Sequence, residues 1–486
     1  MKHKLSILIL VSILFWVFYA LFFKVDYWQN HDGDFQLQRA FAAISSIKSG
    51  QFPLRWASTL NYGCGLPVFN FFYPLIYYVF SLLDLFKIDI FLSFKIILAT
   101  FYTIGTFSIF YFVYSLKKSY SGSLIAAILF ALNPYFLQLV YVRANPEIIT
   151  YGLFPLVLLL INKSKYFSLF FVTILYFLSH NTTVLITFPL IVGFCIYLFV
   201  KNKKINYFLV FTLLLSCLAS SFFLGPAILE KKYVKLGTSI AADYNQHFPT
   251  LKQLFISPWG WGYSTSDTND GMSFKFGYLQ WCLLALTLIL SIRHRYLLYL
   301  SLPLLVCLFM TLPPSKIIWD NLKILHQLQY PWRLLGLSVL LISIISPFTY
   351  LSLPAKFRPL FLLFIIIISL VSNRNHIQAV INPNKPDFTR IGNTTIADEL
   401  LPQGAINDCY HDGKKLSYFP NSYEISQDNK PVDYQECSGY LCTTEGDIST
   451  DNIQWHYTST PIQKIFNYLS LASVVLWLIL TFLRRQ

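Results

Sequence analysis

Apolar segments of membrane-crossing length recur along this chain, and they constrain its fold more than any other feature. A helix of about 20 apolar residues crosses a hydrocarbon core of about 30 Å. Only 12 % of the residues are charged and 55 % are hydrophobic, whereas a soluble domain carries about a quarter charged residues. The strong segments are 5–23, 90–116, 122–142, 147–162, 166–180, 183–200, 207–225, 277–292, 296–312, 333–353, 357–372 and 463–483. They predict a polytopic α-helical membrane protein with about 12 transmembrane helices.

Segment 5–23 and residues 69–86 differ from the other apolar segments in what they predict. Segment 5–23 is long and continuous and lacks a small-residue cleavage site, so it predicts a signal anchor that is not removed. Residues 69–86 (FNFFYPLIYYVFSLLDLF) are about as apolar as the other segments. Whether this stretch crosses the membrane decides the side on which every later connection lies.

Basic residues answer that question, because they gather in every second connection. The clusters are Lys2/Lys4, Lys117/Lys118, Lys163/Lys165, Lys201/Lys203/Lys204, Arg293/Arg295, Lys356/Arg358 and Arg484/Arg485. All seven lie in the cytoplasm, with both termini, if 69–86 does not cross. We therefore predict that 69–86 lies along the outer interface as an aromatic-rich helix, with Pro67 and Pro74 marking its start. The formal charge of +14 then reflects topology in the plasma membrane, and not a nucleic-acid partner.

Three large regions face the outside in this topology. Residues 24–89 and 230–276 are outer loops of a transmembrane body that spans 1–372, and the second contains PWGWGY. Residues 373–461 alternate polar and apolar positions between turn signals, which predicts a small β-rich extracytoplasmic domain. Residues 462–486 then form a C-terminal transmembrane helix. In an oxidising compartment Cys437 and Cys442 are close enough in sequence to form a disulfide, and Cys409 pairs with one of them or stays free.

Polar residues gather at the outer ends of the predicted spans. Ionisable groups at membrane depth are costly and usually mark a site or a partner. Four unrelated connections present such groups at one face, which predicts a shared cavity. The residues are His31, Asp32 and Asp34 after the first span, Arg143 and Glu147 in YVRANPE, His180 and Asn181 in LSHNTT, and Tyr330, Trp332 and Arg333 in QYPWR.

Six of these residues also have a purely structural interpretation. Asp32 and Asp34 precede FQLQRAFAAI and are favoured caps of a helix N-terminus. Arg143 and Glu147 are spaced for an ion pair across one helical turn. His180 suits an interfacial position, and Arg333 beside Trp332 suits a side chain that reaches from the apolar region to the interface.

The set of residues favours transfer chemistry at the outer face. A carboxylate can take a proton from an acceptor hydroxyl, and arginines can bind the phosphate that leaves on a lipid. PWGWGY suits stacking against sugar rings, although Trp and Tyr are also ordinary interfacial anchors. The sequence contains no phosphate-cradling glycine loop and no paired CxxC motif, which disfavours a nucleotide-driven pump.

Several stretches resemble known membrane proteins. The first span, the acidic first outer loop and the multi-span body resemble the GT-C superfamily of lipid-phosphate-dependent glycosyltransferases. More narrowly, the chain is similar to bacterial membrane proteins described as 6-pyruvoyl-tetrahydropterin synthase-related, and to the YfhO-like group. The stretches are HDGDFQLQRAFAAISSIKSGQFPLRW, NYGCGLPVFNFFYPLIYY, YVRANPE, LSHNTT and QYPWR, up to about Gly336. They add Arg39 and Arg55 as candidate substrate-binding residues.

This resemblance implies roles for individual residues. Asp32 matches the first-loop acid of GT-C enzymes, which is a base or a cation-linked carboxylate, and Glu147 resembles the second-loop acid. Where relatives have D-x-x-F-H, this chain has Gln36, which cannot titrate, so a histidine role there is lost or falls to His31. No pterin-synthase activity is implied, because that chemistry needs a zinc site of clustered histidines and the nine histidines here are scattered.

The sequence therefore predicts a membrane glycosyltransferase of the cell envelope, which moves a sugar from a polyprenyl-phosphate carrier to an acceptor at the outer face. Asp32 is the predicted base, and Asp34 holds a divalent cation (Mg²⁺ or Mn²⁺) together with Asp32 or orients the loop. Arg143 and Arg333 hold the donor phosphate, and Glu147 and His180 complete the wall. Two alternatives are a lipid or polysaccharide transporter and a non-catalytic scaffold that uses 373–461 as its binding module.

Overall fold

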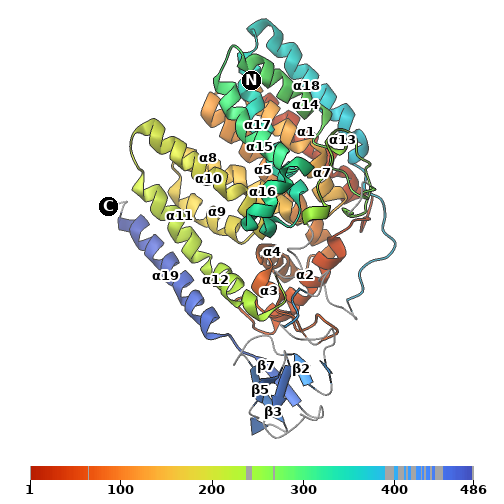
Figure 1. Cartoon of the computed structure of the whole chain (residues 1–486), viewed down its shortest axis with the longest axis vertical. Coiled ribbons are helices and arrows are strands. Elements are labelled where there is room, and N and C mark those ends of the chain that lie inside the picture. The colour runs from red at the N-terminus through yellow and green to blue at the C-terminus, as the bar shows by residue number, and fades with distance from the viewer. Residues whose placement is uncertain are drawn as a thin grey trace. The chain divides into compact units, whose positions relative to one another are not determined.

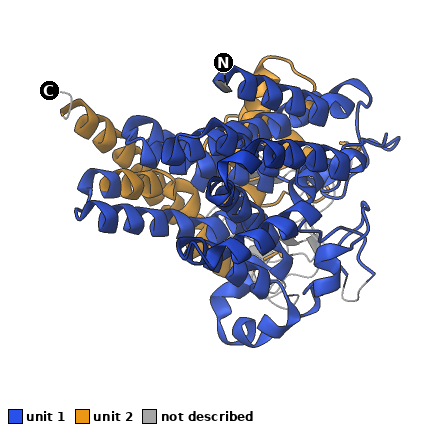
Figure 2. Ribbon diagram, turned by 90° about the horizontal axis from the view of Figure 1, so that it is seen from above, with its two compact units in different colours: residues 1–36, 91–210, 243–385 blue, residues 37–90, 211–242, 386–486 orange. Residues whose placement is uncertain are grey.

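A computed structural model describes most of this chain as helices (Figure 1). The described residues are 2–63, 65–236, 244–265, 269–388, 399–402 and 453–483, together with the backbone of short strands between 410 and 443. These residues divide into two compact units (Figure 2). Unit 1 comprises Met1–Gln36, Phe91–Val210 and Asp243–Lys385, and unit 2 comprises Leu37–Ile90, Phe211–Ala242 and Pro386–Gln486.

Unit 1 is built from helices that pack around α17 (Leu334–Ser352). This helix is buried along most of its length and packs against α6, α14 and α15. Its other helices are α1 (Lys2–Phe23), most of α5 (Ile90–Lys117), α6 (Tyr120–Ala131), α7 (Pro134–Tyr141), α8 (Glu147–Asn162), α9 (Tyr166–Phe177), α10 (Asn181–Asn202), α13 (Leu251–Phe255), α14 (Tyr278–Ser291), α15 (Tyr296–Met310), α16 (Lys316–Asn321) and α18 (Arg358–Asn373). Short 3₁₀ turns, including Lys323–Leu328 and Pro331–Arg333, lead into α17.

A glycine sets the approach of α8 to α5. A Cβ atom added at Gly152 would lie 2.2 Å from the backbone oxygen of Phe101, far inside van der Waals contact. Only glycine therefore allows the two backbones to come this close, and small residues serve the same purpose between membrane helices generally. The contact fixes the position of α8, whose first residue is Glu147.

Six of the described helices are long and apolar enough to cross a membrane, and nine spans result if each of three bent helix pairs counts as one. The chain is therefore a helical membrane protein. The predicted count of 12 would also need the shorter helices α8, α9 and α14 to cross, and it stays a prediction, as does the orientation of the termini.

Three of the predicted spans belong to helix pairs that are bent. Segment 122–142 comprises α6 and α7, which are bent by 46° relative to each other. Segment 207–225 belongs to a helix pair with a bend of 61°, and α15, which begins segment 296–312, is followed by α16 after a bend of 90°. In the first case Pro134 opens α7, and Asn133 caps it by accepting a hydrogen bond from the Tyr135 amide at 2.8 Å. Proline removes the hydrogen bond that would continue α6, and the cap satisfies one of the exposed amides of the new helix.

Unit 2 contains most of α2 (Gly33–Lys48), with α3 (Val68–Phe71), α4 (Leu75–Leu85), most of α11 (Tyr207–Ala219), α12 (Ser221–Leu229) and α19 (Pro461–Leu483). The predicted interfacial helix 69–86 is two helices instead of one. Extended backbone at Phe72 ends α3 and Pro74 precedes α4, because proline cannot donate the backbone hydrogen bond that a continuous helix needs there.

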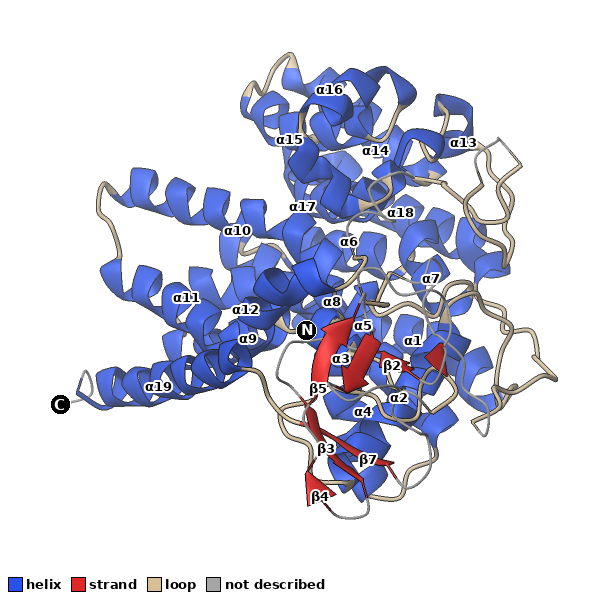
Figure 3. Cartoon of the chain, turned by 60° about the horizontal axis from the view of Figure 1, so that its bottom comes forward, coloured by secondary structure: helices blue, strands red, loops and turns tan. Residues whose placement is uncertain are grey.

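Short strands occupy part of 373–461 (Figure 3). Their bounds are β1 (Tyr410–His411), β2 (Lys414–Leu416), β3 (Tyr423–Gln427), β4 (Lys430–Pro431), β5 (Tyr434–Cys437), β6 (Tyr440–Thr443) and β7 (Ile453–Tyr457). All the pairings are antiparallel, in the orders β1-β2-β6-β5 and β4-β3-β7. A separate β-rich domain stays a prediction, and the Cys437–Cys442 disulfide concerns side chains outside the described part of the chain.

A buried polar cluster in unit 2 joins α3, α12 and α19. Glu230 is fully buried just after α12, and its Oε2 accepts hydrogen bonds from Asn70 Nδ2 at 2.7 Å and Gln463 Nε2 at 2.9 Å. Its Oε1 accepts from the Thr460 hydroxyl. A buried acceptor with three donors is stabilising only while every member is paired.

We expect Glu230→Ala to lower the free energy of unfolding by about 2–3 kcal/mol, because it leaves buried amide donors unpaired. Unfolding of the purified protein in SDS measures this difference. Lys48→Ala is the matched control, since Lys48 is largely exposed and pairs with Asp84, and it should change the free energy by less than about 1 kcal/mol. Equal effects of the two variants would contradict the structural role of Glu230.

Candidate functional site

The loop after α1 is tied to the connection between α7 and α8. The backbone N–H groups of His31 and Asp32 donate to the carbonyl oxygens of Val142 at 2.8 Å and Arg143 at 2.9 Å. The Trp28 indole donates to the Val140 carbonyl at 3.2 Å. These backbone contacts bring the first predicted acidic residue against the predicted arginine, although they are 111 positions apart in the sequence (143 − 32).

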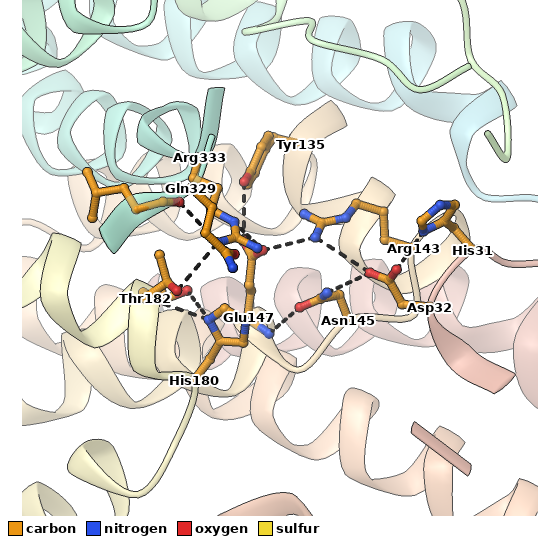
Figure 4. A network of polar contacts seen from close by, with 12 residues as sticks. His31, Asp32, Tyr135, Arg143, Asn145, Glu147, His180, Thr182, Gln329 and Arg333 are labelled. Carbon is orange, nitrogen blue, oxygen red and sulfur yellow. Dashed lines mark hydrogen bonds and ion pairs between the residues drawn. The ribbon is translucent and has the colours of Figure 1, made fainter. Parts of the chain in front are cut away.

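The carboxylate of Asp32 has donors on both oxygens (Figure 4). Oδ1 lies 2.5 Å from His31 Nδ1, and Oδ2 accepts from Asn145 Nδ2 at 2.6 Å. Arg143 Nη2 lies 3.5 Å from Oδ2. Burial by itself would raise the pKa of Asp32, but the hydrogen bond to His31 and the charge of Arg143 outweigh it and hold the pKa well below its usual range. Asp32 is therefore ionised at neutral pH.

Arg143 bridges the two predicted acids. The same Nη2 lies 3.0 Å from Glu147 Oε1, and the guanidinium stacks on the Trp332 ring at 4.8 Å from its centroid. Burial alone would lower the pKa of Arg143, but Glu147 and Asp32 raise it above its ordinary value. The predicted ion pair between Arg143 and Glu147 is thus present, although Arg143 lies in the loop before α8 and not on a helix. It forms part of a larger network.

Glu147 also pairs with Arg333. It is fully buried, its Oε1 lies 3.5 Å from Arg333 Nε, and its Oε2 accepts from the Tyr135 hydroxyl at 3.3 Å. Arg333 Nη1 donates to the Leu328 carbonyl at 3.0 Å and to the Gln329 side chain. Arg333 is buried and does not extend to an exposed interface. Its guanidinium charge is instead compensated by the carboxylate of Glu147.

Three buried N–H donors in this network lack a hydrogen-bond partner among the described residues. They are Arg143 Nη1, Trp332 Nε1 and Arg333 Nε, of which the last lies 3.5 Å from Glu147 Oε1 in an ion pair. Arg143 is 5 % exposed and Trp332 is 3 % exposed, and the two side chains stack on each other. Buried donors are normally paired, so a pair of them in contact favours a ligand that offers acceptor oxygens.

His180 caps α10 and is buried. Its Nδ1 lies 2.9 Å from the Thr183 hydroxyl, and its backbone N–H donates to the Thr150 hydroxyl at 3.0 Å. Burial lowers the pKa of His180 to about 3, so the ring is neutral at physiological pH. Asn181 is the first residue of the same helix. These contacts agree with a histidine held for structural reasons at the wall of the site.

The remaining predicted residues lie elsewhere or have other partners. Asp34 lies in the first turn of α2 and accepts a hydrogen bond from the Tyr27 hydroxyl. Arg39 and Arg55 belong to unit 2, where Arg39 stacks on Phe72 at 4.4 Å. Arg55 donates to Asn467 Oδ1 at 3.0 Å and to the carbonyl of Phe222. Roles for these three in substrate binding stay predictions.

Tyr330 extends the aromatic side of the site. Its ring stacks on Trp332 with a centroid distance of 5.2 Å and an interplanar angle of 13°, and Arg333 lies over it at 5.1 Å. Cations over aromatic faces are held by the ring quadrupole. Both arginines of the network therefore have an aromatic contact as well as a carboxylate.

Four residues of the network were not among the predicted ones. Asn145 and Gln329 lie within YVRANPE and QYPWR, between or beside residues that the sequence did indicate. Thr182, in LSHNTT, accepts from Arg333 Nη1 at 3.4 Å. Tyr135 lies in an apolar segment, and nothing in its sequence context distinguishes it from the other 31 tyrosines.

Nitrogen donors already occupy the carboxylate oxygens that a divalent cation at Asp32 would need. Both oxygens of Asp32 face nitrogen donors, one of them a guanidinium, whereas Mg²⁺ and Mn²⁺ prefer free oxygen ligands. Among the described residues, no group of three or more His, Cys, Asp and Glu side chains could hold a metal. A cation at Asp32 and Asp34 stays a prediction.

Comparisons with known proteins give likenesses among solved structures. No family model matches the chain, and no curated protein matches it. A single-particle cryo-EM structure of the arabinofuranosyltransferase AftD from Mycobacteria aligns with 77 % of this chain and 26 % of its own, at 14 % identity and a TM-score of 0.47. A mutant of AftD aligns with 77 % of this chain and 28 % of its own, at 14 % identity and a TM-score of 0.45. The chain thus spans about a quarter of the length of these proteins.

Proposed function

We propose that this protein is a membrane glycosyltransferase that moves a sugar from a polyprenyl-phosphate carrier to a hydroxyl acceptor at the outer face of the membrane. The observation that carries the proposal is the network of Asp32, Arg143, Glu147 and Arg333. Arg143 Nη1 and the adjoining Trp332 Nε1 are buried N–H donors without a hydrogen-bond partner in the described part of the chain. Ionised groups next to membrane-crossing helices usually serve a ligand or a reaction.

The network supplies the two functions that such a transfer needs. Asp32 is ionised and supports removal of the acceptor proton. Arg143 Nη1 and Trp332 Nε1 donate to the phosphate oxygens, and Arg143 and Arg333 stabilise the charge that develops as the lipid phosphate leaves. A lipid-phosphate donor also explains why the site lies among membrane helices. The sequence resemblance to GT-C enzymes supports the same assignment.

Binding of the carrier lipid tests the phosphate site. We expect native mass spectrometry to show undecaprenyl phosphate bound to the wild-type protein, with affinity about 10- to 100-fold lower in Arg143→Lys. Lysine keeps a positive charge for Asp32 and Glu147, but it lacks the second nitrogen, and one charge-assisted hydrogen bond contributes about 1.5–3 kcal/mol.

Arg293→Lys is the control for this experiment. Arg293 is exposed and lies in a different connection, between α14 and α15, so this variant should bind the lipid as the wild type does. Absence of bound undecaprenyl phosphate, under conditions that retain ordinary phospholipids, would contradict the proposed function and favour a scaffold. Equal binding by the wild type and both variants would contradict the role of Arg143.

A further inference from the structure

The ring of His31 is the more accessible member of the His31–Asp32 pair. The His31 side chain is 26 % exposed and the Asp32 side chain 17 %. Both Asp32 oxygens are engaged, by His31 Nδ1 on one side and by Asn145 and Arg143 on the other. An acceptor hydroxyl that used Asp32 would therefore share the carboxylate oxygens with donors already bound to them. Within the described residues, His31 Nε2 has no hydrogen-bond partner.

The neighbouring carboxylate defines the tautomer of His31. A neutral imidazole has one N–H donor and one acceptor nitrogen. Because Nδ1 lies 2.5 Å from an ionised carboxylate, the proton is on Nδ1 and the lone pair is on Nε2. This is the arrangement in which an acid holds a histidine so that its far nitrogen can accept a proton.

We propose that His31, through Nε2, is the general base that contacts the acceptor, and that Asp32 is the positioning residue behind it. This inference rests on the proposed function and specifies which atom takes the proton. The exposed ring of Tyr263 lies beside the His31 ring, at 6.0 Å between centroids. An aromatic face in this position suits the ring of a saccharide acceptor that presents its hydroxyl to Nε2.

The step balances without an additional reactant. The acceptor O–H proton moves to His31 Nε2 while the acceptor oxygen forms a bond to the anomeric carbon of the donor sugar. The bond from that carbon to the phosphate oxygen breaks, and its electron pair leaves on the polyprenyl phosphate. Asp32 stabilises the imidazolium that forms, and the proton passes to water after the products leave.

The tautomer of His31 tests this inference without a transfer assay. Solid-state NMR of ¹⁵N-histidine-labelled protein in liposomes at pH 8 distinguishes a protonated Nδ1 from a protonated Nε2. We expect the His31 signal, assigned by its loss in His31→Gln, to show protonated Nδ1 and unprotonated Nε2. Asp32→Ala should convert a measurable fraction to the other tautomer, and His294→Gln should leave the signal unchanged. A protonated Nε2 in the wild type would overturn the proposal.

Chemical rescue separates a base from a structural residue. We expect His31→Ala to lower transfer from an undecaprenyl-phosphate sugar about 10²–10⁴-fold, and added imidazole to restore part of the activity. His31→Ala that retains full activity, or that imidazole does not rescue, would overturn the role of His31. If the wild type transfers no sugar from any donor of this class while its tautomer is as expected, the proposed function fails and the His31–Asp32 geometry stands.

Discussion

Asp32→Asn is expected to reduce glycosyl transfer by about 10³–10⁴-fold, which is the loss seen when a histidine base is left in the wrong tautomer. Asparagine has the shape of aspartate, but its amide cannot supply the charge that holds Nδ1 protonated and stabilises the imidazolium. Arg143 keeps Glu147 as a partner at 3.0 Å, so the network loses one charge while this ion pair remains. The rate of sugar transfer in liposomes, with an undecaprenyl-phosphate sugar as donor, measures the effect.

Asp84→Asn is the matched control, because Asp84 pairs with Lys48 in unit 2. It should transfer sugar at the wild-type rate. Both variants should elute as the wild type does in size-exclusion chromatography, which excludes misfolding as the cause. Full activity in Asp32→Asn would contradict both the role of Asp32 and the proposed role of His31 as the general base. If function instead survives in this variant and is lost on deletion of residues 373–461, the scaffold interpretation is favoured.

Glu147→Ala is expected to destabilise the protein by about 3–5 kcal/mol, which is the usual effect of removing one partner from a buried ion pair. Glu147 is fully buried, and both Arg143 and Arg333 depend on its Oε1. Alanine would leave two guanidinium groups next to each other, with Asp32 as the remaining acid and in contact with only one of them. SDS-induced unfolding of the purified variant measures the change.

A double-mutant cycle tests whether the loss of stability comes from the buried guanidinium charge that is left without a carboxylate partner. In Glu147→Gln/Arg333→Gln a positive and a negative charge are removed together, so the double variant should be less destabilised than the sum of the two single variants. Asp84→Ala, at a partly exposed ion pair with Lys48, should change the free energy by less than about 1 kcal/mol. Additive effects of the two glutamine substitutions would show that Glu147 and Arg333 do not interact energetically.

The sequence predicted the members of the site better than the shape of the helices that carry it. Charged residues are rare here, so their occurrence at the outer ends of apolar segments already indicated Asp32, Arg143, Glu147 and Arg333. The network then depends on contacts between connections far apart in the chain. Residues such as Tyr135, which contribute one hydroxyl from within an apolar helix, carry no comparable signal in the sequence.

Helix breaks were missed because proline alone does not specify them. Pro155, Pro189, Pro303 and Pro347 all lie inside continuous helices, whereas Pro134 begins a new one. The difference at this position is Asn133, whose side chain caps α7 and also donates to the carbonyl of Phe276 at 3.1 Å. That second contact joins residues 143 positions apart, and a local reading of the sequence cannot identify it.

Arg55 shows the same limit for a charged side chain. Its place in a stretch that resembles GT-C proteins made it a candidate substrate-binding residue, and that role stays a prediction. Its guanidinium contacts Asn467 and the Phe222 carbonyl. The Asn467 contact joins residues 412 positions apart, which proximity in sequence cannot reveal. The position of Arg55 is therefore set by the packing of α12 and α19 in unit 2.

The polar cluster around Glu230 has a consequence for biosynthesis. Glu230 is synthesised well before Gln463, which follows 233 residues later. Until α19 is synthesised, Glu230 has at most Asn70 to pair with, and the carboxyl group must stay hydrated or be covered by an insertion factor. Completion of unit 2 is thus coupled to arrival of α19, and a ribosome stalled before Thr460 would leave a polar group exposed to membrane quality control.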